Sequence, residues 1–547
     1  MKKLLVFLIV IGLIFGGVYF LLFRDVESDE ASVLYVDQRL VYEGELQPIE
    51  SSKLVSGQVY LSYDFIKEKL DEDIHYDDAE KTVVITSPSM VRRYKLDSLE
   101  GTANDVVISL RAPITEIDGT LMLPIEAFVY DYPIDAKYNS EENIITIDRT
   151  DTEYAKGKII VDKSSLREDS DIDSPIVKTL TKDTEVYVYG ETEKFYKVRE
   201  INGRAGYVRK RHLELSYQFE SFTRPIKSEE LASLEERDKI NLVWDYTFIR
   251  TENGNAVENL VGVNVISPTW FSLNEDLSIT DRSNMDYIVV SKRYGYDVWP
   301  MFDNNFEERL TENALATSSQ RQKIISNMYE IATRLDLDGI NIDFENINVH
   351  TRENFTQFVR ELYPIFKQSD MVVSVDVTPR IFSDVEKEPY DRAALAKAAD
   401  YVMLMAYDQH WATSPTAGSV AEYNWVENNM NVLFRSIPME KFILSMPLYT
   451  RIWFETDGKV SSQSVSMEMA NEYIRNNNIE LEWDDQVKQL VGRKQSGNTN
   501  VSIWLEDAQS IAAKTSLATK YDIAGVASWR KGFETPNIWS VINENLK

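Results

Sequence analysis

The sequence of 547 residues contains no cysteine. Disulfide bonds, thiolate metal sites and cysteine nucleophiles are therefore excluded. Histidine is almost absent too, with four residues in the whole chain, so a histidine-rich metal centre is not expected. Positive charge is also scarce, since 59 Lys and Arg residues stand against 89 Asp and Glu residues, and the formal net charge is −30. Such a chain repels nucleic-acid phosphates, and no nucleic-acid partner is expected.

The composition is otherwise that of folded domains. Hydrophobic residues make up 43% and charged residues 27% of the chain, the usual balance of globular proteins. At roughly 150 residues per domain, the length predicts three or four folded units.

One long apolar run stands near the start of the chain. The segment 4–23 is apolar with few exceptions, and about 20 such residues span a bilayer as a helix. Lys2 and Lys3 precede this run and acidic residues follow it, which favours a cytoplasmic N-terminus. We therefore expect residues 1–31 to be a transmembrane signal anchor and juxtamembrane segment, with the rest of this single-pass protein outside the cell membrane. A cleaved signal peptide is the alternative, although the run is long for one.

Residues 32–150 contain an internal repeat. The segment Gly57–Ile66 (GQVYLSYDFI) recurs 62 positions later as Gly119–Phe128 (GTLMLPIEAF), and the register continues into Thr82–Ile85 and Ile144–Ile147. Each copy predicts a short strand, a helix and a pair of β segments, which makes a small α+β repeat domain. The pattern resembles the N-terminal domain of copper amine oxidases, which is reused in bacterial surface proteins. The resemblance implies a spacer or wall-contacting role, and no metal-binding residues carry over.

Residues 156–216 change to short alternating strands separated by turn residues, such as Glu185–Gly190, Phe195–Arg199 and Gly203–Val208. This spacing is typical of a small β-barrel. The pattern resembles a bacterial SH3 domain, a module often linked to cell-wall binding. Its aromatic residues either bind a ligand or fill the core. Residues 217–237 are rich in Ser and Glu and lack strand periodicity, which predicts a linker.

Residues 238–547 alternate β-like apolar runs with amphipathic helices, as expected of parallel strands joined by crossover helices. This length suffices for a closed (β/α)8 TIM barrel, so the predicted fold class is α/β. Eight strands are predicted: Ile240–Asp245, Gly262–Ser267, Asp297–Phe302, Gly339–Glu345, Val372–Val377, Tyr401–Asp408, Phe442–Tyr449 and Ala524–Trp529. The segment from about 450 to 505 exceeds a normal loop and predicts an insertion over the strand ends.

The fourth predicted strand alternates apolar and polar residues. The apolar set is Ile340, Ile342 and Phe344, and the polar set is Asn341, Asp343 and Glu345. In a strand these sets point to opposite faces, so the polar set lines the barrel interior if the apolar set packs under the helices. Glu345 then lies at the carboxyl end of the strand, where the active sites of such barrels are built. A buried ion network or an ordinary polar strand face is the alternative.

Three motifs in this region resemble glycoside hydrolase family 18. The segment Asp338–Glu345 (DGINIDFE) is similar to the DGxDxDxE signature, Met405–Asp408 (MAYD) to the MxYD motif of strand six, and Trp529 stands in the place of the strand-eight tryptophan. The resemblance covers about residues 239–547 and is closest to the bacterial cell-wall and spore-cortex branch. One position departs from the signature, because Asn341 replaces its middle aspartate.

The resemblance implies retaining, substrate-assisted hydrolysis, in which the substrate's own 2-acetamido oxygen attacks in place of an enzyme carboxylate. Glu345 would then be the general acid, Asp343 would orient the acetamido N–H and stabilise the oxazolinium, and Tyr407 would hydrogen-bond the acetamido group. Burial and a neighbouring carboxylate can keep such an acid protonated near working pH. The candidates for substrate binding are Asp338, Asn341, Met405, Asp408, Tyr449, Arg451 and Trp529. No cofactor and no metal are expected.

Several of these candidates also have plainer interpretations. Tyr407 and Asp408 would otherwise cap a strand end, and Trp529 would be an ordinary core residue. His410 is interpreted as a loop residue. The sequence thus predicts a membrane-tethered enzyme that cleaves β-1,4 bonds after N-acetylglucosamine, in peptidoglycan. Hydrolysis of chitin and a non-catalytic, glycan-binding wall scaffold on the same barrel are the alternatives.

Overall fold

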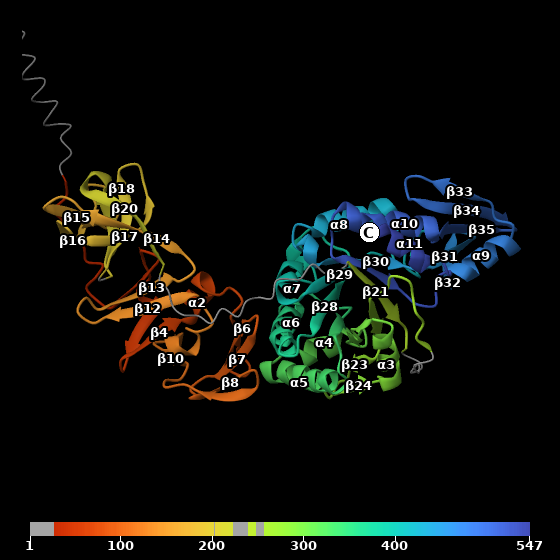
Figure 1. The fold of residues 1–547 in the computed structure, drawn as a ribbon, viewed down its shortest axis with the longest axis horizontal. Helices are drawn as coiled ribbons and strands as arrows, with labels where there is room; N and C mark the ends of the chain where they lie inside the picture. The colour runs from red at the N-terminus through yellow and green to blue at the C-terminus, as the bar shows by residue number, and fades with distance from the viewer. Residues whose placement is uncertain (1–26, 202, 222–238, 248–255) are drawn as a thin grey trace, which may run out of the picture. The chain divides into compact units, whose positions relative to one another are not determined.

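The computed structural model describes residues 27–201, 203–221, 239–247 and 256–547 (Figure 1). The apolar run predicted to anchor the chain, 4–23, lies outside the described residues. Within the described ranges, no helix has both the length and the apolar character needed to cross a membrane. The chain forms two compact units: unit 1 comprises Met1–Ile74, Tyr94–Gly101 and Ile108–Leu231, and unit 2 comprises His75–Arg93, Thr102–Val107 and Ala232–Lys547.

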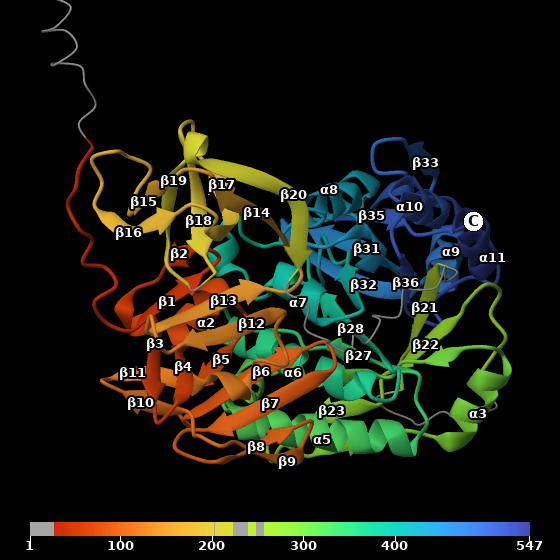
Figure 2. The ribbon, with the colours of Figure 1, turned by 60° about the vertical axis from the view of Figure 1, so that its left-hand side comes forward.

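The two copies of the sequence repeat pair with each other in unit 1. Strand β4 (Gln58–Ser62) lies antiparallel to β11 (Thr120–Pro124) in a four-stranded sheet of order β10-β11-β4-β3, seen at the lower left of Figure 2. The strands at its edges are β10 (Thr115–Ile117) and β3 (Ser52–Val55). Leu61 pairs directly with Leu123, its equivalent 62 positions later, and both are fully buried. The repeat is therefore arranged about a local two-fold axis between these leucines.

The copies differ in the segment after these strands. In the first copy, the Ser62 side chain accepts a hydrogen bond from the Phe65 N–H and starts helix α2 (Tyr63–Lys69). In the second copy Pro124 stands in place of Ser62 and provides no side-chain cap, and only a 3₁₀ turn, Ile125–Ala127, forms. The prediction of a helix is thus correct for the first copy and wrong for the second.

The β hairpins that end the two copies join different sheets. In the second copy β12 (Ile134–Asn139) pairs with β13 (Ile144–Arg149), which continues to β1 (Arg39–Tyr42) and β2 (Glu45–Leu46) in unit 1. In the first copy β5 (His75–Asp77) and β6 (Thr82–Ser87) belong to a sheet with β7 (Met90–Lys95), β8 (Glu100–Ala103) and β9 (Val106–Ser109). Val84 and Val91 from β6 and β7 are fully buried in the same hydrophobic cluster as the barrel helices of unit 2.

The SH3-like region forms a seven-stranded sheet of order β16-β15-β19-β18-β17-β14-β20. The strands are β14 (Glu153–Ile159), β15 (Lys163–Arg167), β16 (Ile176–Thr181), β17 (Glu185–Glu191), β18 (Phe195–Glu200), β19 (Ala205–Arg209) and β20 (Leu213–Ser221). Leu166, Val198 and Val208 are buried in its core. Residues 217–221, predicted to begin the linker, belong to a strand, because the backbone of β20 pairs with β14 as far as Ser221. The sequence did not indicate this strand, since backbone pairing does not require alternating apolar residues. Residues 222–237 of that linker lie outside the described ranges.

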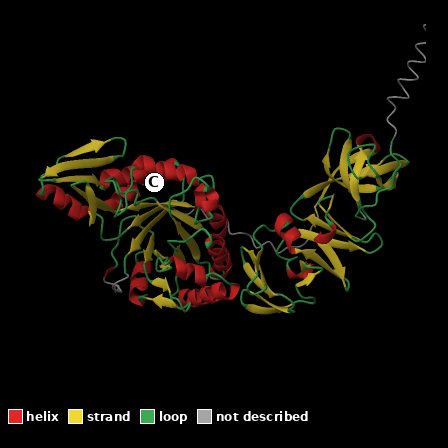
Figure 3. Ribbon diagram, turned by 180° about the vertical axis from the view of Figure 1, so that it is seen from behind, coloured by secondary structure: helices red, strands yellow, loops and turns green. Residues whose placement is uncertain are grey.

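Unit 2 is a closed parallel β-barrel surrounded by helices (Figure 3). Its strands are β21 (Ile240–Asp245), β22 (Val265–Pro268), β25 (Asp297–Val298) continued by β26 (Met301–Asp303), β27 (Gly339–Asp343), β28 (Val372–Val377), β29 (Tyr401–Met405), β30 (Phe442–Pro447) and β36 (Gly525–Trp529). The barrel closes because β21 pairs in parallel with both β36 and β22. The TIM-barrel prediction is confirmed, with a break in the third strand at Pro300, which has no N–H for the sheet.

Helices and two short strands complete the barrel. The helices are α3 (Met285–Arg293), α4 (Glu308–Ala314), α5 (Ser318–Arg334), α6 (Arg352–Lys367), α7 (Arg392–Ala398), α8 (Tyr423–Leu433), α10 (Ala508–Lys520) and α11 (Ile538–Asn545), and the strands are β23 (Phe271–Leu273) and β24 (Ile279–Asp281). Ile340, Ile342 and Phe344 pack outward in the cluster beneath these helices, where Phe344 stacks on Phe355 and Phe358 of α6. The polar residues of β27 consequently face the barrel interior, as predicted.

A second small sheet follows strand β30. Its strands are β31 (Tyr449–Thr456), β32 (Lys459–Ser466), β33 (Leu481–Asp484), β34 (Gln489–Ser496) and β35 (Thr499–Leu505), in the order β32-β31-β35-β34-β33. Helix α9 (Met467–Asn476) packs on it through Ile474, and Ile452 and Ile503 complete a separate core. The long segment between the seventh and eighth barrel strands therefore folds on its own hydrophobic core.

Candidate active site

Glu345 follows the carboxyl end of β27, and its backbone is held from the neighbouring strand. The Glu345 N–H donates to Asn304 Oδ1 at 3.1 Å, and Asn304 Nδ2 donates to the Glu345 carbonyl oxygen at 2.7 Å. Asn304 is fully buried, and its Nδ2 also donates to Thr311 Oγ1 on α4. One side-chain amide thus fixes the main chain that presents the Glu345 carboxyl.

The Glu345 carboxyl keeps its proton to a higher pH than an ordinary glutamate does. Burial and then the nearby carboxylates of Asp408 and Asp303 raise its pKa to about 7. Both causes disfavour the anion, because a buried charge loses hydration and like charges repel. A carboxylic acid with this pKa can donate a proton at the pH of most cells and their surroundings.

Three aspartates lie at one level across adjacent strands of the barrel interior. The register of β26 and β27 places Asp303 opposite Asp343. The register of β27 and β28 pairs Ile342 with Val375, so the next residues along, Asp343 and Asp376, are also neighbours. Adjacent strands are about 4.8 Å apart, and all three aspartates are almost fully buried.

Mutual repulsion in this row changes the protonation of its members. Burial, and after it Glu345, Asp376 and Asp303, raise the pKa of Asp343 well above its ordinary value. Burial and Glu345 likewise raise the pKa of Asp376, although a hydrogen bond from Asn341 opposes them. Within the part of the chain that the structure describes, Asp343 Oδ1 and Asp376 Oδ2 have no hydrogen-bond partner. Two buried acceptors without donors imply that protons are retained here.

Asn341 lies one layer below this row, and its amide connects the side chains of Trp244, Asp376 and Ser374. Its Oδ1 accepts from Trp244 Nε1 at 2.8 Å, and its Nδ2 donates to Asp376 Oδ1 at 3.0 Å and Ser374 Oγ at 3.2 Å. The residue has no exposed surface. The prediction that Asn341 binds substrate is therefore corrected: its amide is used entirely inside the barrel. An amide suits this place because it donates and accepts at once.

Tyr407 faces the carboxyl row from the loop after β29. Burial raises the pKa of its phenol well above 10, and Asp343, Asp376 and Glu345 raise it further. The phenol consequently stays protonated and can donate a hydrogen bond into the site. Met405, at the end of β29, is 7% exposed, and strand alternation puts it on the same face as Met403 of the inner barrel core.

Residues 302–533 match the sequence profile of Glycosyl hydrolases family 18, and this match contains Glu345 and the aspartate row. This part of the barrel is similar to family 18 glycosyl hydrolases, and it is named the family 18 domain after that similarity. Residues 38–147 match the copper amine oxidase N-terminal domain and residues 163–214 the bacterial SH3 domain. The three resemblances read from the sequence are confirmed.

Curated relatives of the family 18 domain include bacterial lytic enzymes. The chain is 24% identical over 314 residues to the uncharacterized glycosylase YvbX of Bacillus subtilis (strain 168), covering 52% of this chain and 85% of that protein. It is 23% identical over 275 residues to the cortical fragment-lytic enzyme of the same organism, covering 49% of this chain and 62% of that protein. The match thus leaves over a third of the lytic enzyme uncovered.

Two solved structures share the fold of the domain. The spore cortex-lytic enzyme SleL of Bacillus megaterium QM B1551 superposes with a TM-score of 0.52 at 19% identity, over 58% of this chain and 76% of that one. The C-terminal domain of a putative chitinase from Desulfitobacterium hafniense DCB-2 gives 0.52 at 21% identity, over 57% and 100%.

Asp408 begins a hydrogen-bonded group at the rim of the family 18 site. Asp408 Oδ1 accepts from the Tyr449 hydroxyl at 2.7 Å and from an Arg451 guanidinium nitrogen at 3.0 Å. Tyr449 and Arg451 are nearly buried, whereas the Asp408 side chain is 44% exposed. The structure therefore brings together these three predicted binding residues, with Asp408 as the accessible one.

Trp529 provides a flat surface at the end of β36. Its ring lies 5.9 Å from the ring of Trp244 and 6.3 Å from that of Tyr246, and it packs on the inner barrel core. Since Trp244 donates to Asn341, the aromatic floor and the polar network below the carboxyls form one connected layer.

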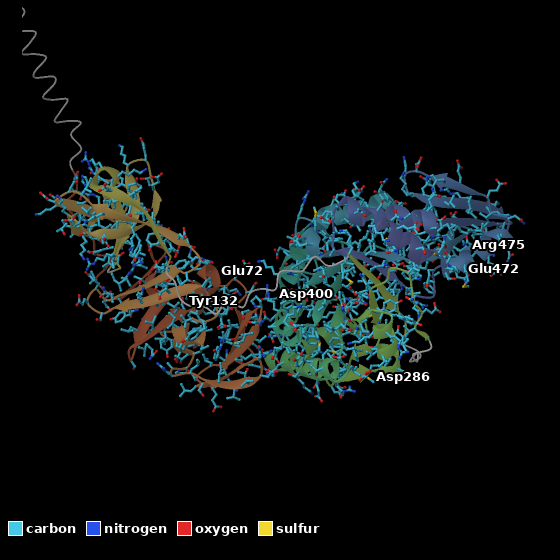
Figure 4. All side chains as sticks on the ribbon, in the orientation of Figure 1. Glu72, Tyr132, Asp286, Asp400, Glu472 and Arg475 are labelled. Carbon is cyan, nitrogen blue, oxygen red and sulfur yellow. The ribbon has the colours of Figure 1, made fainter. Side chains whose placement is uncertain are left out.

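Asp338 does not belong to the family 18 site, and its prediction as a binding residue is corrected. It precedes β27, at the opposite end of that strand from Glu345, where it accepts from the Val298 N–H and pairs with Lys292. Asp400, labelled in Figure 4, does the same before β29, accepting from the Val373 N–H and pairing with Lys367. Both aspartates tie neighbouring strands together at the amino end of the barrel.

The sequence motifs missed several residues of the site. Asp303, Asn304 and Asp376 lie outside the three motifs, as does Tyr390, whose hydroxyl donates to the Phe344 carbonyl. A signal for Asp376 was present, because Ser374 and Asp376 interrupt a run of valines at every second position of a buried strand. That is the same alternation that marked Glu345.

Proposed function

We propose that this protein hydrolyses β-1,4 glycosidic bonds after N-acetylglucosamine, with retention, and that peptidoglycan is its substrate. The observation that carries the proposal is the Glu345 carboxyl, whose pKa of about 7 keeps a proton available at the carboxyl end of β27. Glu345 gives this proton to the glycosidic oxygen as the bond to the leaving sugar breaks. Because a protonated leaving group departs as a neutral alcohol, the barrier falls.

The residues beside Glu345 suit participation of the substrate's acetamido group. Positions two apart on a strand are about 6.6 to 7 Å apart, so Asp343 and Glu345 address adjacent parts of one sugar. Asp343 accepts from the acetamido N–H and stabilises the oxazolinium cation, while Tyr407 donates to the acetamido group. Trp529 supports the sugar ring from below, and Asp408 with Tyr449 and Arg451 binds hydroxyl groups at the rim.

Large apolar side chains on the loops above the site fit a polymeric glycan. Trp411, after β29, is 52% exposed, and Phe382, after β28, is 46% exposed. Loops at this end of the strands surround the site in such barrels. Exposed flat side chains there can pack on the apolar faces of sugar rings beyond the one that is cleaved.

The choice of peptidoglycan rests on the accompanying modules and relatives. The SH3 and copper amine oxidase-like regions are of kinds associated with bacterial surfaces, and similar proteins include cortex-lytic enzymes of Bacillus. We propose further that residues 1–31 tether the chain to the cell membrane with its catalytic domain outside. Chitin is the alternative substrate, supported by the similarity to a probable chitinase of Drosophila melanogaster, 22% identical over 358 residues.

Digestion of defined glycans tests the proposal. The purified chain is incubated with peptidoglycan and with chitin oligomers, and the new reducing ends are identified by mass spectrometry after borohydride reduction. We expect N-acetylglucosamine ends from peptidoglycan, absent with the Glu345→Gln variant and present with Glu386→Gln, whose side chain is exposed. Cleavage of chitin alone would move the assignment to chitin. Binding without cleavage of either glycan would contradict the enzymatic proposal and favour a wall scaffold.

A further inference from the structure

Asp376 is a buried carboxyl inside the site that none of the sequence motifs contains. It is 1% exposed at the end of β28. Its Oδ1 accepts from Asn341 Nδ2 at 3.0 Å, whereas its Oδ2, like Asp343 Oδ1, has no hydrogen-bond partner among the described residues. The hydrogen bond from Asn341 fixes the carboxyl plane and leaves Oδ2 available.

Asp343 on β27 is the neighbour of Asp376 in the strand register. Asp343 and Asp376 occupy the same level of adjacent parallel strands and point to the same face. The other ionisable groups around the Asp343–Asp376 pair are Asp303 on β26, which lies beside Asp343, together with Glu345 after β27, Tyr390 and Tyr407. All of them are acids. Two buried carboxyls in such surroundings cannot both ionise, so at least one proton remains on the pair.

We propose that Asp376 and Asp343 share one proton, and that Asp376 is the positioning residue that accepts it when Asp343 acts as an anion. The inference rests on the proposed function, because the charge that Asp343 stabilises is the oxazolinium. As that cation forms, the shared proton moves onto Asp376 Oδ2, and Asp343 is left as the carboxylate beside it. The proton returns to a position between the two when water hydrolyses the intermediate.

Asn341 explains why Asp343 shares its proton with a residue of the neighbouring strand β28. A neutral amide at 341 can donate to Asp376 without adding a further charge to the interior. An aspartate there would be a fourth carboxyl beside Asp303, Asp343 and Asp376, and it could not donate unless protonated. Asn341 on β27 thus donates the hydrogen bond, and Asp376 on β28 accepts the proton.

The variant Asp376→Asn tests the inference through kcat, KM and their pH dependence. We expect kcat to fall about 10- to 100-fold with KM changed less than about twofold, because proton exchange and not binding is lost. The acidic limb of the kcat/KM profile should move to lower pH, since Asp343 loses a like-charged neighbour. Ser374→Ala removes another Asn341 contact without touching a carboxyl, and it should leave the profile unchanged.

An exchange of side chains separates proton sharing from a structural role. The double variant Asn341→Asp/Asp376→Asn keeps an amide–carboxyl hydrogen bond across the same 3.0 Å and returns a carboxyl to the neighbourhood of Asp343. We expect it to recover at least part of the kcat lost in Asp376→Asn. A loss of activity with an unshifted profile and no recovery would overturn the inference.

The stability of the protein gives a readout that does not need hydrolysis. Because the pKa of Asp376 is raised in the folded state, stability falls as pH rises, and Asp376→Asn should flatten this fall in a thermal melt series. If Asp376→Asn flattens the melt series but the wild type cleaves no glycan, the shared proton is supported and the proposed function is contradicted. Cleavage by the wild type with an unchanged profile and an unchanged series in the variant would overturn the inference alone.

Discussion

Unit 2 contains two groups of buried ionisable residues, which avoid an unpaired buried charge in opposite ways. In the arginine-clamped cluster (Arg93, Arg321, Glu361), Glu361 Oε1 accepts from Arg321 Nε at 2.9 Å and Oε2 accepts from an Arg93 guanidinium nitrogen at 2.8 Å. In the carboxyl cluster (Asp303, Asp343, Glu345, Asp376), acids face acids and two oxygens lack donors among the described residues. The first arrangement neutralises its charge, and the second prevents charge from forming.

The pKa shifts of the two clusters have opposite signs. Burial alone would raise the pKa of Glu361, but the Arg321 and Arg93 guanidiniums outweigh it and lower the pKa below its ordinary value. Its contribution to stability is present above the ordinary glutamate pKa and is lost as pH falls below it. For Glu345 the folded pKa is raised to about 7, so stability is full below about 4.5 and declines as pH rises through 7. A buried charge that costs stability at working pH indicates function.

The largest expected effect breaks the carboxyl cluster at Glu345. In Glu345→Gln the general acid is absent, and hydrolysis should fall about 10³-fold or more. Stability at pH 8 should instead rise by up to about 3 kcal/mol, since no anion has to form in the buried site. Glycan release and thermal melts at pH 8 measure the two quantities on one sample. A variant that loses activity together with stability would show that the carboxyl cluster, too, is structural.

The next effect comes from the arginine-clamped cluster. Glu361→Gln leaves two buried guanidiniums without their anion and should lower the free energy of unfolding by about 3 kcal/mol. The pH profile of the remaining activity should not move. Urea denaturation measures the loss, with Glu353→Gln as control, because that side chain lies on the same helix and is 73% exposed. A shifted pH profile in Glu361→Gln would mean that the two clusters are coupled.

The smallest effect concerns the support of Glu345 from β26. Asn304→Ala removes both hydrogen bonds to the Glu345 backbone and should reduce kcat about tenfold, because the carboxyl is then less well positioned. The pKa seen on the alkaline limb should stay near 7, since its causes remain. Steady-state kinetics against pH check this, with the exposed Asn431→Ala on α8 as control. Unchanged kcat in Asn304→Ala would show that β27 alone positions the acid.

The barrel could be predicted from the sequence because each buried strand is a short apolar run bounded by turn residues. Glu345 and Asp343 could be predicted because their alternation and motif are local. Asp303 and Asp376 could not be placed beside Asp343, since the register between strands is not written in either strand alone. The same applies to Asp77, which accepts from the Ser318 N–H at the start of α5, 241 positions away. Asp338 was misassigned because the motif Asp338–Glu345 runs the whole length of β27. Its first residue therefore lies at the amino end of the barrel, away from Glu345.

Direct titration of the Glu345 carboxyl tests the central claim that the pKa of this acid is raised to about 7. The protein is labelled with ¹³C at the glutamate side-chain carboxyl carbon, and NMR spectra are recorded from pH 4 to 9 for the wild type and for Glu345→Gln. The signal missing from the variant identifies Glu345. Our account predicts a midpoint of about 7 for that signal. A midpoint near 4.5, the ordinary value for glutamate, would contradict it.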